Sequence, residues 1–294
     1  MVTGKTRLGC LLGSPVAHSI SPMMHNEAFR LLGIDNIYMC FDTGGKDLGR
    51  IVNSLRDMNV YGFNLTMPDK DRVIPYLDEL TDAARMIGAV NTVKNDGGRL
   101  IGYNTDGIGY MHAVADAGYD ISSGTMTLFG AGGAASAIAV QAALDGAPAL
   151  HIVQRQGKSW ENANRLASVI SEQTKCRADV IDMSDDQAVK AAVMESSLLT
   201  NATSMGMAPA KLDLTPVNDK SCFHPGLVVS DAIYNPQETR LLREAKEAGC
   251  RTFNGMYMLL YQGAAGFEIW TGQKMPVEEI RKKFFSQKQQ ETEK

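Results

Sequence analysis

The chain has 294 residues, of which 44 % are hydrophobic and 21 % are charged, and its formal net charge is −4. This composition is typical of globular domains and lacks the basic excess of a nucleic-acid-binding protein. No apolar run approaches the roughly 18 residues of a transmembrane helix, and the N-terminus has no signal-peptide form, so we expect a cytoplasmic location. The five cysteines lack CxxC spacing and indicate reduced thiols. The histidines lack ligand spacing, so we expect no metal site.

The first 60 residues predict alternating strands and helices. We expect strands at 8–13 and 37–41 and helices at 23–32 and 48–58, with Ser21 as N-cap and Gly33 as the helix stop. Ser19 lies in the loop before the first helix, where hydroxyl donors and a helix N-terminus suit a carboxylate. The alternative is that Ser21 only caps the helix and that Ser19 is solvated.

Polar residues then follow the ends of strands. A third strand at 61–68 delivers Asn64, Thr66 and Lys70 to the edge where open α/β sheets bind ligands, although Lys70 alone would also fit a solvated surface lysine. A hairpin with its turn at 95–98 is predicted between 89–94 and 99–104. Its arms end in Asn91-Thr92 and Asn104-Thr105-Asp106. Asp106 either caps the next helix, 107–117, or belongs to a site.

The stretch 129–136, Phe-Gly-Ala-Gly-Gly-Ala-Ala-Ser, has the form of a dinucleotide-binding turn. An apolar strand, 125–129, leads into it and an Ala-rich helix, 134–144, follows, which is the context this motif requires. Gly130 permits the tight turn, and Gly132 permits close approach of a pyrophosphate to the backbone. The helix N-terminus then offers free N–H groups to the phosphates. A plain strand-to-helix turn with small packing residues is the alternative.

Beyond residue 125, strands and helices alternate and predict a parallel sheet with helices on both faces. The expected strands are 125–129, 149–153, 178–181, 198–201, 227–232 and 251–253. The expected helices are 160–171, 186–194 and 239–248. The segments 201–207 and 231–236 follow strand ends and should face one crevice. An apolar helix at 256–270 carries Gln262, which is either a buried structural amide or a ligand contact, and a final helix spans 276–285. The tail, 287–294, is expected to fray.

Taken together, these motifs resemble one family, the shikimate dehydrogenases, including their quinate/shikimate branch. The matching motifs are 18–26 (HSISPMMHN), 64–70 (NLTMPDK), 88–92 (GAVNT), 102–107 (GYNTDG), 130–134 (GAGGA), 201–203 (NAT), 234–236 (YNP) and 261–264 (YQGA). They occur in the order of the family and span nearly the whole chain. Each motif is weak alone, whereas the set is specific, since unrelated dehydrogenases share only the glycine turn.

The resemblance implies an α/β fold with two domains. Residues 1–106 and 256–294 would form an α/β substrate-binding catalytic domain, and 107–255 a Rossmann-like, doubly wound dinucleotide-binding domain, with a C-terminal helix returning to the first domain. The implied activity is interconversion of shikimate and 3-dehydroshikimate by hydride transfer with NADP(H), in the pathway to chorismate and the aromatic amino acids. Such a reaction needs a group that exchanges the hydroxyl proton, while the cofactor carries the hydride.

The resemblance also assigns residues to the site. Lys70 would be the catalytic acid/base, with Asp106 beside it, and shikimate would lie in the cleft. The implied substrate-binding residues are Ser19 and Ser21 for the carboxylate and Thr66, Lys70, Asn91, Asp106, Tyr234 and Gln262 for the ring. The implied cofactor-binding residues are Gly130, Ala131, Gly132, Gly133, Ala134, Gln154, Arg155, Lys158, Thr203, Met205, Ala232 and Gly255.

Two departures bear on specificity. After the second Rossmann strand, where an NAD site usually has an acid, the chain reads Gln154-Arg155-Gln156-Gly157-Lys158, which favours NADP over NAD. Thr66 stands where the dual-specificity branch tends to have Ser, and its methyl group would crowd the extra hydroxyl of quinate. The spelling of 67–70 is nevertheless closer to that branch.

The alternatives are a quinate/shikimate dehydrogenase using NAD(H) and a non-catalytic dinucleotide-binding regulator. The expected partner is a small-molecule substrate, shikimate or quinate, and a homodimer remains open. Neither nucleic acid nor a membrane is expected.

Overall fold

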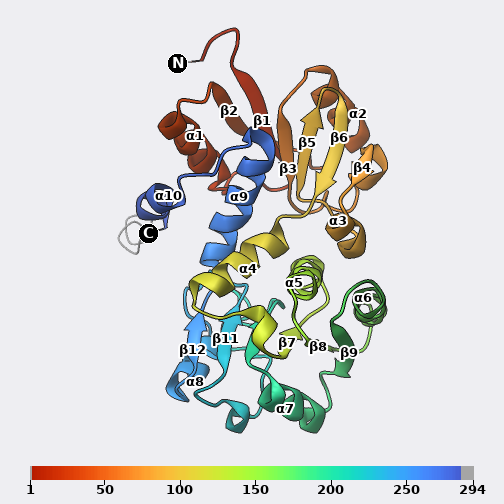
Figure 1. Cartoon of the computed structure of the whole chain (residues 1–294), viewed down its shortest axis with the longest axis vertical. Helices are drawn as coiled ribbons and strands as arrows, with labels where there is room; N and C mark the ends of the chain where they lie inside the picture. Colours follow the sequence, from red (N-terminus) through yellow and green to blue (C-terminus); the bar gives the residue numbers. More distant parts are fainter. Residues whose placement is uncertain (1, 286–294) are drawn as a thin grey trace. The chain divides into compact units, whose positions relative to one another are not determined.

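The computed structural model describes residues 2–285 of the chain. Their contacts separate two compact units, one drawn from Met1–Thr105 with Leu260–Lys294 and the other from Asp106–Leu259. Each unit contains one six-stranded sheet with helices packed on it (Figure 1). The expected α/β fold with two sheets is confirmed. The functional names given above to the two domains stay predictions, as do their borders.

The first unit contains a mixed sheet. Its strands are β1 (Arg7–Gly13), β2 (Asn36–Asp42), β3 (Gly62–Leu65), β4 (Glu79–Leu80), β5 (Thr92–Asp96) and β6 (Arg99–Tyr103), and its helices are α1 (Ser21–Leu32), α2 (Leu48–Asp57), α3 (Asp82–Ile87), α9 (Met256–Thr271, whose first turn falls in the second unit) and α10 (Val277–Phe284). The strand order is β2-β1-β3-β5-β6-β4. β5 runs antiparallel to β3 and β6, whereas the pairs β1–β2, β1–β3 and β4–β6 are parallel.

The start of α1 differs from the prediction. Ile20 occupies the N-cap and Ser21 is the first helical residue, so the N-cap prediction for Ser21 is wrong. The helical hydrogen bonds begin one residue earlier than expected, because the N–H of Met24, which a cap at Ser21 would bind, is taken by the carbonyl of Ile20 at 3.1 Å. The hydroxyl of Ser19 accepts the N–H of Ser21 at 3.2 Å. Gly33 ends the helix in the left-handed conformation with φ 67°, as expected.

The hairpin also has a tighter turn than expected. Its two loop residues are Gly97 and Gly98, both with positive φ, because β5 continues through Asp96, which pairs with Arg99. The amide oxygen of Asn95 accepts the N–H of Gly98 at 2.8 Å and so stabilises the turn from within the strand. Two consecutive positive φ angles are the requirement of a type I′ turn, which glycine meets without strain.

The helix α9 packs on the first unit, which confirms the expected return of the C-terminal helix (Figure 1). The indole N–H of Trp270 donates to the carbonyl of Val93 at 2.9 Å. A Cβ atom on Gly263 would lie 2.1 Å from the Cε of Met24, so glycine here lets α9 approach α1 closely. Phe267 stacks on the aromatic cluster of His25 and Phe29.

The second unit contains an entirely parallel sheet. Its strands are β7 (Met126–Phe129), β8 (Ala149–Gln154), β9 (Arg177–Asp182), β10 (Leu198–Asn201), β11 (Val228–Asp231) and β12 (Arg251–Phe253), and its helices are α4 (Asp106–Asp116), α5 (Gly133–Leu144), α6 (Trp160–Gln173), α7 (Asp186–Glu195) and α8 (Arg240–Glu247). The order β12-β11-β10-β7-β8-β9 is the Rossmann order. The chain therefore changes direction across the sheet between β7 and β10, where open sheets of this kind bind ligands.

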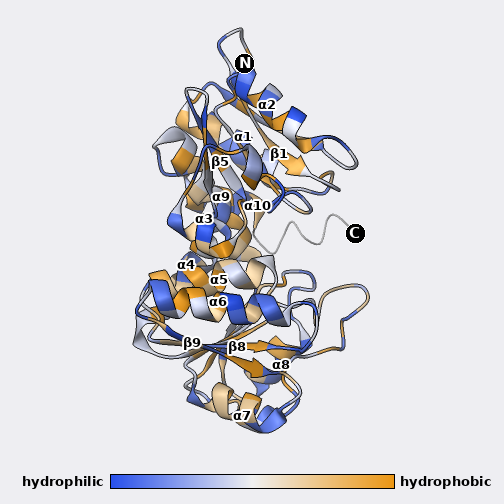
Figure 2. Ribbon diagram, turned by 90° about the vertical axis from the view of Figure 1, so that its right-hand side faces the viewer, coloured by the Kyte–Doolittle hydropathy of each residue, from blue (hydrophilic) through white to orange (hydrophobic). Residues whose placement is uncertain are grey.

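Apolar strands and amphipathic helices build the core of this unit. Figure 2 shows β8 as mainly hydrophobic, whereas α6 carries hydrophilic residues and buries a stripe that includes Leu166 and Ile170. α5 buries small residues on several sides, and a Cβ atom on Gly107 would lie 2.3 Å from the carbonyl oxygen of Ala137. α4 and α5 thus pack with their backbones close together.

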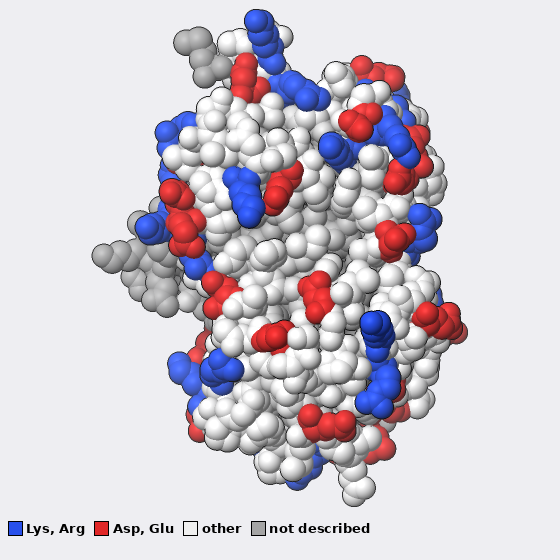
Figure 3. All heavy atoms as spheres, in the orientation of Figure 1, with Lys and Arg blue, Asp and Glu red and all other residues white. Residues whose placement is uncertain are grey.

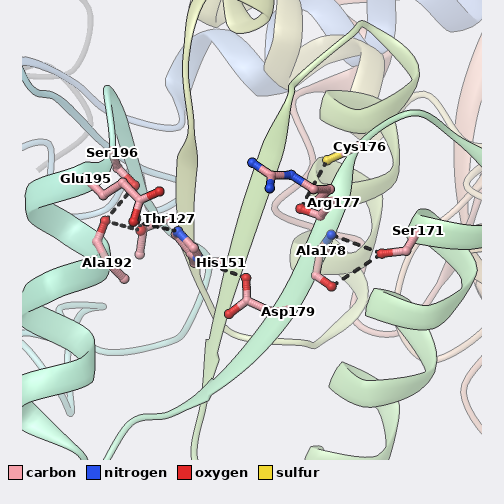
Figure 4. Close-up of polar contacts among 10 residues, drawn as sticks. All are labelled: Thr127, His151, Ser171, Cys176, Arg177, Ala178, Asp179, Ala192, Glu195 and Ser196. Carbon is pink, nitrogen blue, oxygen red and sulfur yellow. Dashed lines mark hydrogen bonds and ion pairs between the residues drawn. The ribbon is translucent and has the colours of Figure 1, made fainter.

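Polar side chains connect β8 to its neighbours, as Figure 4 shows. The ring of His151 contacts the carboxylate of Asp179 on β9 at 2.7 Å, and this carboxylate raises the pKa of the imidazole. Nearby, the hydroxyls of Thr127 on β7 and Ser196 after α7 lie 2.8 Å apart. These contacts join β8 to β9 and the end of α7 to β7.

On the face that Figure 3 shows, Lys and Arg side chains are interspersed with Asp and Glu. Within residues 2–285, no helix is long and apolar enough to cross a membrane. In the same residues, no cluster of His, Cys, Asp and Glu could hold a metal ion. The five cysteines are free thiols. The prediction for 287–294 lies outside the described residues.

Candidate functional site

The loop before α1 holds Ser19 and Ser21 in the first unit. Ser21 is buried at the start of the helix and Ser19 is half-buried. Because the hydroxyl of Ser21 does not cap α1, the capping alternative for Ser21 is removed. The hydroxyl of Ser19 accepts the first N–H of the helix, and both residues remain candidates for a carboxylate. Sequence reasoning missed Cys40 on β2. Burial raises the pKa of its thiol, and a hydrogen bond with Ser19 partly offsets this rise. Cys40 lies within the continuous apolar run of β2, which gave no signal for this contact.

Thr66 and Lys70 follow β3, as predicted. Thr66 directs its methyl group against Gly13, where a Cβ atom would lie 2.3 Å from it, so glycine at 13 leaves the space that this methyl group occupies. The half-buried Lys70 is anchored through its carbonyl, which accepts the N–H of Val90 at 2.7 Å. This bond places the turn that carries Lys70 beside the segment that carries Asn91.

Asn91 is 2 % exposed and lies in a network of buried polar side chains. Its amide oxygen accepts the N–H of Thr105 at 2.7 Å and the hydroxyl of Thr92 at 2.9 Å. Its amide N–H donates to the hydroxyl of Thr105 at 3.0 Å. Both threonines are fully buried, so these hydrogen bonds are made in an interior where leaving one unmade is costly.

Asn64 extends this network to the far side of the sheet. Its amide group donates to the carbonyl of Asn91 at 3.0 Å and to the hydroxyl of Thr92 at 2.9 Å, and its oxygen accepts the hydroxyl of Tyr38 at 2.6 Å. The sequence suggested Asn64 as a polar group at a strand end. The structure instead buries it, 7 % exposed, as the residue that orients Asn91.

The remaining predicted substrate residues are found on three elements. Gln262 lies in α9, half-buried, within the first unit. Asp106 is the first residue of α4 and is 9 % exposed, and Tyr234 follows β11 and is 43 % exposed; both fall in the second unit. Asp106 directly follows Thr105 in the chain, so its backbone is anchored by the Asn91 network.

The glycine turn after β7 has the geometry that dinucleotide binding requires. Gly130 adopts φ 107°, and a Cβ atom on it would lie 3.1 Å from the carbonyl oxygen of Ala202. Cβ atoms on Gly132 and Gly133 would meet nothing within 4 Å, so the backbone is open on this side. α5 begins there without a side-chain cap, which leaves its first N–H groups directed at this opening. Ala131 and Ala134 flank the two glycines, buried and exposed respectively. These residues fit a pyrophosphate.

The end of β8 carries the predicted 2′-phosphate residues. Arg155 and Lys158 are exposed, and Gln154 is half-buried with its amide N–H on the carbonyl of Arg155. Sequence reasoning missed Asp182, which ends β9 opposite Gln154 and accepts a hydrogen bond from Gln156. A local search of 154–159 could not find an acid that the sheet brings in from 182.

Sequence reasoning also missed Asn162 on α6. Its amide group donates to the carbonyl of Ala131 at 2.6 Å and holds the glycine turn from outside. A polar residue at the start of an amphipathic helix gives no such signal, because only the packing of α6 on the sheet brings it to the turn.

The ends of β10, β11 and β12 carry the other predicted cofactor residues, which are Thr203, Met205, Ala232 and Gly255. A Cβ atom on Gly255 would lie 2.1 Å from the carbonyl oxygen of Ala232, so the segment after β12 packs directly on the segment after β11. Thr203 lies beside the glycine turn, its methyl 3.2 Å from the Cβ position of Gly130. All four residues follow the carboxyl ends of their strands, but only Thr203 and Met205 follow β10, which borders the switch point.

The fold and the glycine turn define a class: an α/β protein with a Rossmann-like dinucleotide-binding unit. The match to known families narrows it. Residues 11–93 match the shikimate dehydrogenase substrate binding domain, and residues 255–283 match the shikimate 5′-dehydrogenase C-terminal domain.

Similar proteins cover nearly the whole chain. The chain is 46 % identical to the shikimate dehydrogenase (NADP(+)) of Listeria innocua over 284 residues, 97 % of each chain. It is 40 % identical to a quinate/shikimate dehydrogenase of Escherichia coli, covering 95 % of this chain and 97 % of that one. The crystal structure of shikimate 5-dehydrogenase from Listeria monocytogenes, in complex with shikimate and NAD, superposes with a TM-score of 0.93 at 46 % identity, covering 96 % and 97 % of the two chains. The chain belongs to the shikimate dehydrogenase family.

Proposed function

We propose that this chain interconverts shikimate and 3-dehydroshikimate with NADP(H), in the pathway of aromatic amino-acid biosynthesis. The observation that carries the proposal is the similarity, over 97 % of the chain, to an enzyme named for shikimate and NADP. The Asn91 network and the open glycine turn support it, because they supply a rigid polar framework and a pyrophosphate cradle.

Lys70 is the proposed acid/base. In the oxidation, the neutral amine accepts the proton of the hydroxyl group that becomes the ketone, and in the reduction the ammonium returns it. The nicotinamide, when bound, would accept the hydride from the carbon that bears this hydroxyl group. The bond from the Lys70 carbonyl to Val90 limits the motion of the turn, so the amine starts from a fixed backbone.

Asp106 is proposed as the second catalytic residue. A carboxylate can accept a hydrogen bond from a ring hydroxyl and hold an ammonium group in place. The backbone anchor of Thr105 on Asn91, at 2.7 Å, supports this role because it fixes the residue that precedes Asp106. Thr66, Asn91, Tyr234 and Gln262 are proposed to bind the ring and its hydroxyls.

The substrate carboxylate is assigned to Ser19 and Ser21. Two hydroxyl groups at the N-terminus of a twelve-residue helix form a favourable environment for one negative charge. Shikimate is the proposed substrate rather than quinate. The methyl group of Thr66, packed on Gly13, holds its hydroxyl in one orientation, which suits a single arrangement of substrate hydroxyls.

NADP is the proposed cofactor, with Arg155 and Lys158 on its 2′-phosphate and with the glycine turn on its pyrophosphate. Guanidinium and ammonium groups are the natural partners of a phosphate dianion. NAD is the alternative, favoured by Asp182 at the same end of the sheet and by the NAD complex of the Listeria monocytogenes relative.

One set of assays tests the proposal. Reduction of NADP and of NAD is followed with shikimate and with quinate, and we expect the pair shikimate and NADP to give the highest kcat/KM. Faster reduction of NAD with quinate would contradict this function and identify a quinate/shikimate dehydrogenase that uses NAD(H). Dinucleotide binding without turnover on either substrate would instead identify a regulator.

We also propose that the chain forms a homodimer in the cytoplasm. β2 is an edge strand, and its Met39 and Phe41 are 45 % and 39 % exposed. Asn26 of α1 occupies both backbone groups of Tyr38 on the open edge, at 2.8 and 2.9 Å, so the contact would use side chains rather than strand pairing. Sedimentation of the double variant Met39→Glu, Phe41→Glu should show a monomer, and an unchanged dimer would place the interface elsewhere.

Five free thiols suit a reducing compartment, and fractionation of cells tests the location.

A further inference from the structure

Asp231, the last residue of β11, is a buried carboxylate that the proposed reaction does not use. It is 0 % exposed, and its hydrogen-bond partners within the described residues are all uncharged. Burying a charge without a cation is costly, so such a group needs a structural or functional reason.

The partners of Asp231 all act as donors. The amide of Asn201 donates to both carboxylate oxygens at 3.2 and 3.1 Å. The N–H of Ile233 donates at 2.9 Å and the hydroxyl of Thr239 at 2.9 Å. A ring of donors complements the ionised carboxylate, whereas a proton on either oxygen would face one of these donors.

Asn201 carries the effect of Asp231 to the glycine turn. Its amide oxygen accepts the N–H of Thr203 at 3.0 Å and the hydroxyl of Thr203 at 2.7 Å, and its N–H also reaches the carbonyl of Met205 at 2.9 Å. Thr203 in turn packs against Gly130. One carboxylate therefore orients the amide that holds the segment 203–205 against the dinucleotide-binding turn.

Two neighbouring titratable or charged side chains do not disturb the titration of Asp231. The charge of Asp231 acts on Tyr110 of α4, but burial raises the pKa of this phenol, so it stays neutral. On α8, the guanidinium of Arg240 binds Glu244 at 2.7 Å and not Asp231. Burial raises the pKa of Asp231 itself to about 6.

We propose that ionised Asp231 is a positioning residue for dinucleotide binding, which holds the segment 203–205 in its binding conformation through Asn201, and that protonation of Asp231 weakens this binding. The inference rests on the proposed function, since it takes NADP(H) as the ligand of the glycine turn. It predicts weaker cofactor affinity in mild acid, independent of the chemistry at Lys70.

The test is an equilibrium titration of wild type and Asp231→Asn with NADPH, followed by the fluorescence of the reduced nicotinamide between pH 5 and pH 8. The variant keeps the shape of the side chain and stays neutral at every pH. We expect its Kd to exceed that of wild type by about tenfold at pH 8, the value of one hydrogen bond to a charged group. At pH 5, where wild type is mostly protonated, the ratio should fall to about twofold. Titration of the 2′-phosphate is common to both proteins and cancels in the ratio.

Asp219→Asn is the matched control. This carboxylate lies in the same unit, and hydrogen bonds with Lys190 lower its pKa to about 2, so it does not titrate in this range. The ratio of its Kd for NADPH to that of wild type should stay near one between pH 5 and pH 8. A ratio near one for Asp231→Asn at pH 8, or a raised ratio that does not change with pH, would overturn the proposal.

A second measurement uses wild type alone and does not depend on the folding of the variant. Because binding favours the ionised form, calorimetry with NADH in two buffers of different ionisation enthalpy should show proton release at pH 6 and none at pH 8. Absence of release at pH 6 would also contradict the inference. If wild type bound neither NADPH nor NADH at pH 8, the proposed function itself would fail, which separates the two outcomes.

Discussion

Replacing Asn64 by Leu should cost both stability and substrate affinity. The substitution keeps the approximate volume but removes the bonds to Tyr38, Thr92 and the carbonyl of Asn91. Each net bond is worth about 1 kcal/mol, and each buried group left unsatisfied adds about 1–3 kcal/mol. The buried hydroxyl of Tyr38 loses its bond to Asn64 and has no access to water, whereas the hydroxyl of Thr92 keeps its bond to Asn91. Three lost bonds and one unsatisfied hydroxyl should together lower the free energy of unfolding by about 3–5 kcal/mol.

The affinity effect follows because Thr92 and Asn64 together orient Asn91. We expect the KM for shikimate to rise by about tenfold, equal to one hydrogen bond from the Asn91 side chain to the substrate. Urea unfolding and steady-state kinetics with shikimate as the varied substrate measure the two effects on one preparation.

Leu65→Ala is the matched control for the Asn64 prediction. Leu65 is the next residue of β3, 2 % exposed, and belongs to the hydrophobic cluster on the opposite face of the sheet. Truncation should cost about 2–5 kcal/mol of stability while leaving KM unchanged. A loss under about 1 kcal/mol for Asn64→Leu would refute the reasoning about buried bonds. An unchanged KM would refute the orientation of Asn91.

Four further predictions concern the proposed site. Lys70→Ala should lower kcat by about 10²–10⁴ while shikimate still binds, whereas the exposed Lys5→Ala should be neutral; near-normal kcat for Lys70→Ala would end the acid/base assignment. Ser19→Ala with Ser21→Ala should weaken shikimate binding by about 1.5–3 kcal/mol per lost bond and leave the Kd of NADPH unchanged, and equal effects on both ligands would count against a carboxylate pocket. Arg155→Ala with Lys158→Ala should raise the Kd of NADP more than that of NAD, and titration of both cofactors decides it. Because burial raises the pKa of Asp231 from 3.8 to about 6, the folded state retains a proton that the unfolded state loses. The free energy of unfolding should therefore fall by about 2 kcal/mol between pH 4 and pH 6 relative to Asp231→Asn, and parallel curves for the two proteins would contradict this.

The sequence predicted the elements of the fold because their signals are local. Gly33 indicates a helix end, the Gly97-Gly98 turn indicates a hairpin, and the apolar runs of β7 and β8 indicate buried strands, all without reference to distant residues. β4, with two residues, was missed, since its only support is its pairing with β6. The N-cap prediction for Ser21 was wrong because the helix begins one residue earlier, with the carbonyl of Ile20 on the N–H of Met24.

The chemistry of the site was predicted by residue type and motif, whereas its support was decided by tertiary structure. Lys70 and the glycine turn could be chosen from the sequence because their neighbours in the chain give them context. Asn64 and Asp231 could not be recognised as buried organising groups, because their partners, Tyr38 and Thr239 among them, come from other elements. Burial depends on the packing of the whole unit, and burial is what raises the pKa of Asp231 and makes each bond of Asn64 costly to lose. The sequence alone thus determined which groups are available for catalysis, and only the fold decided which groups hold them in place.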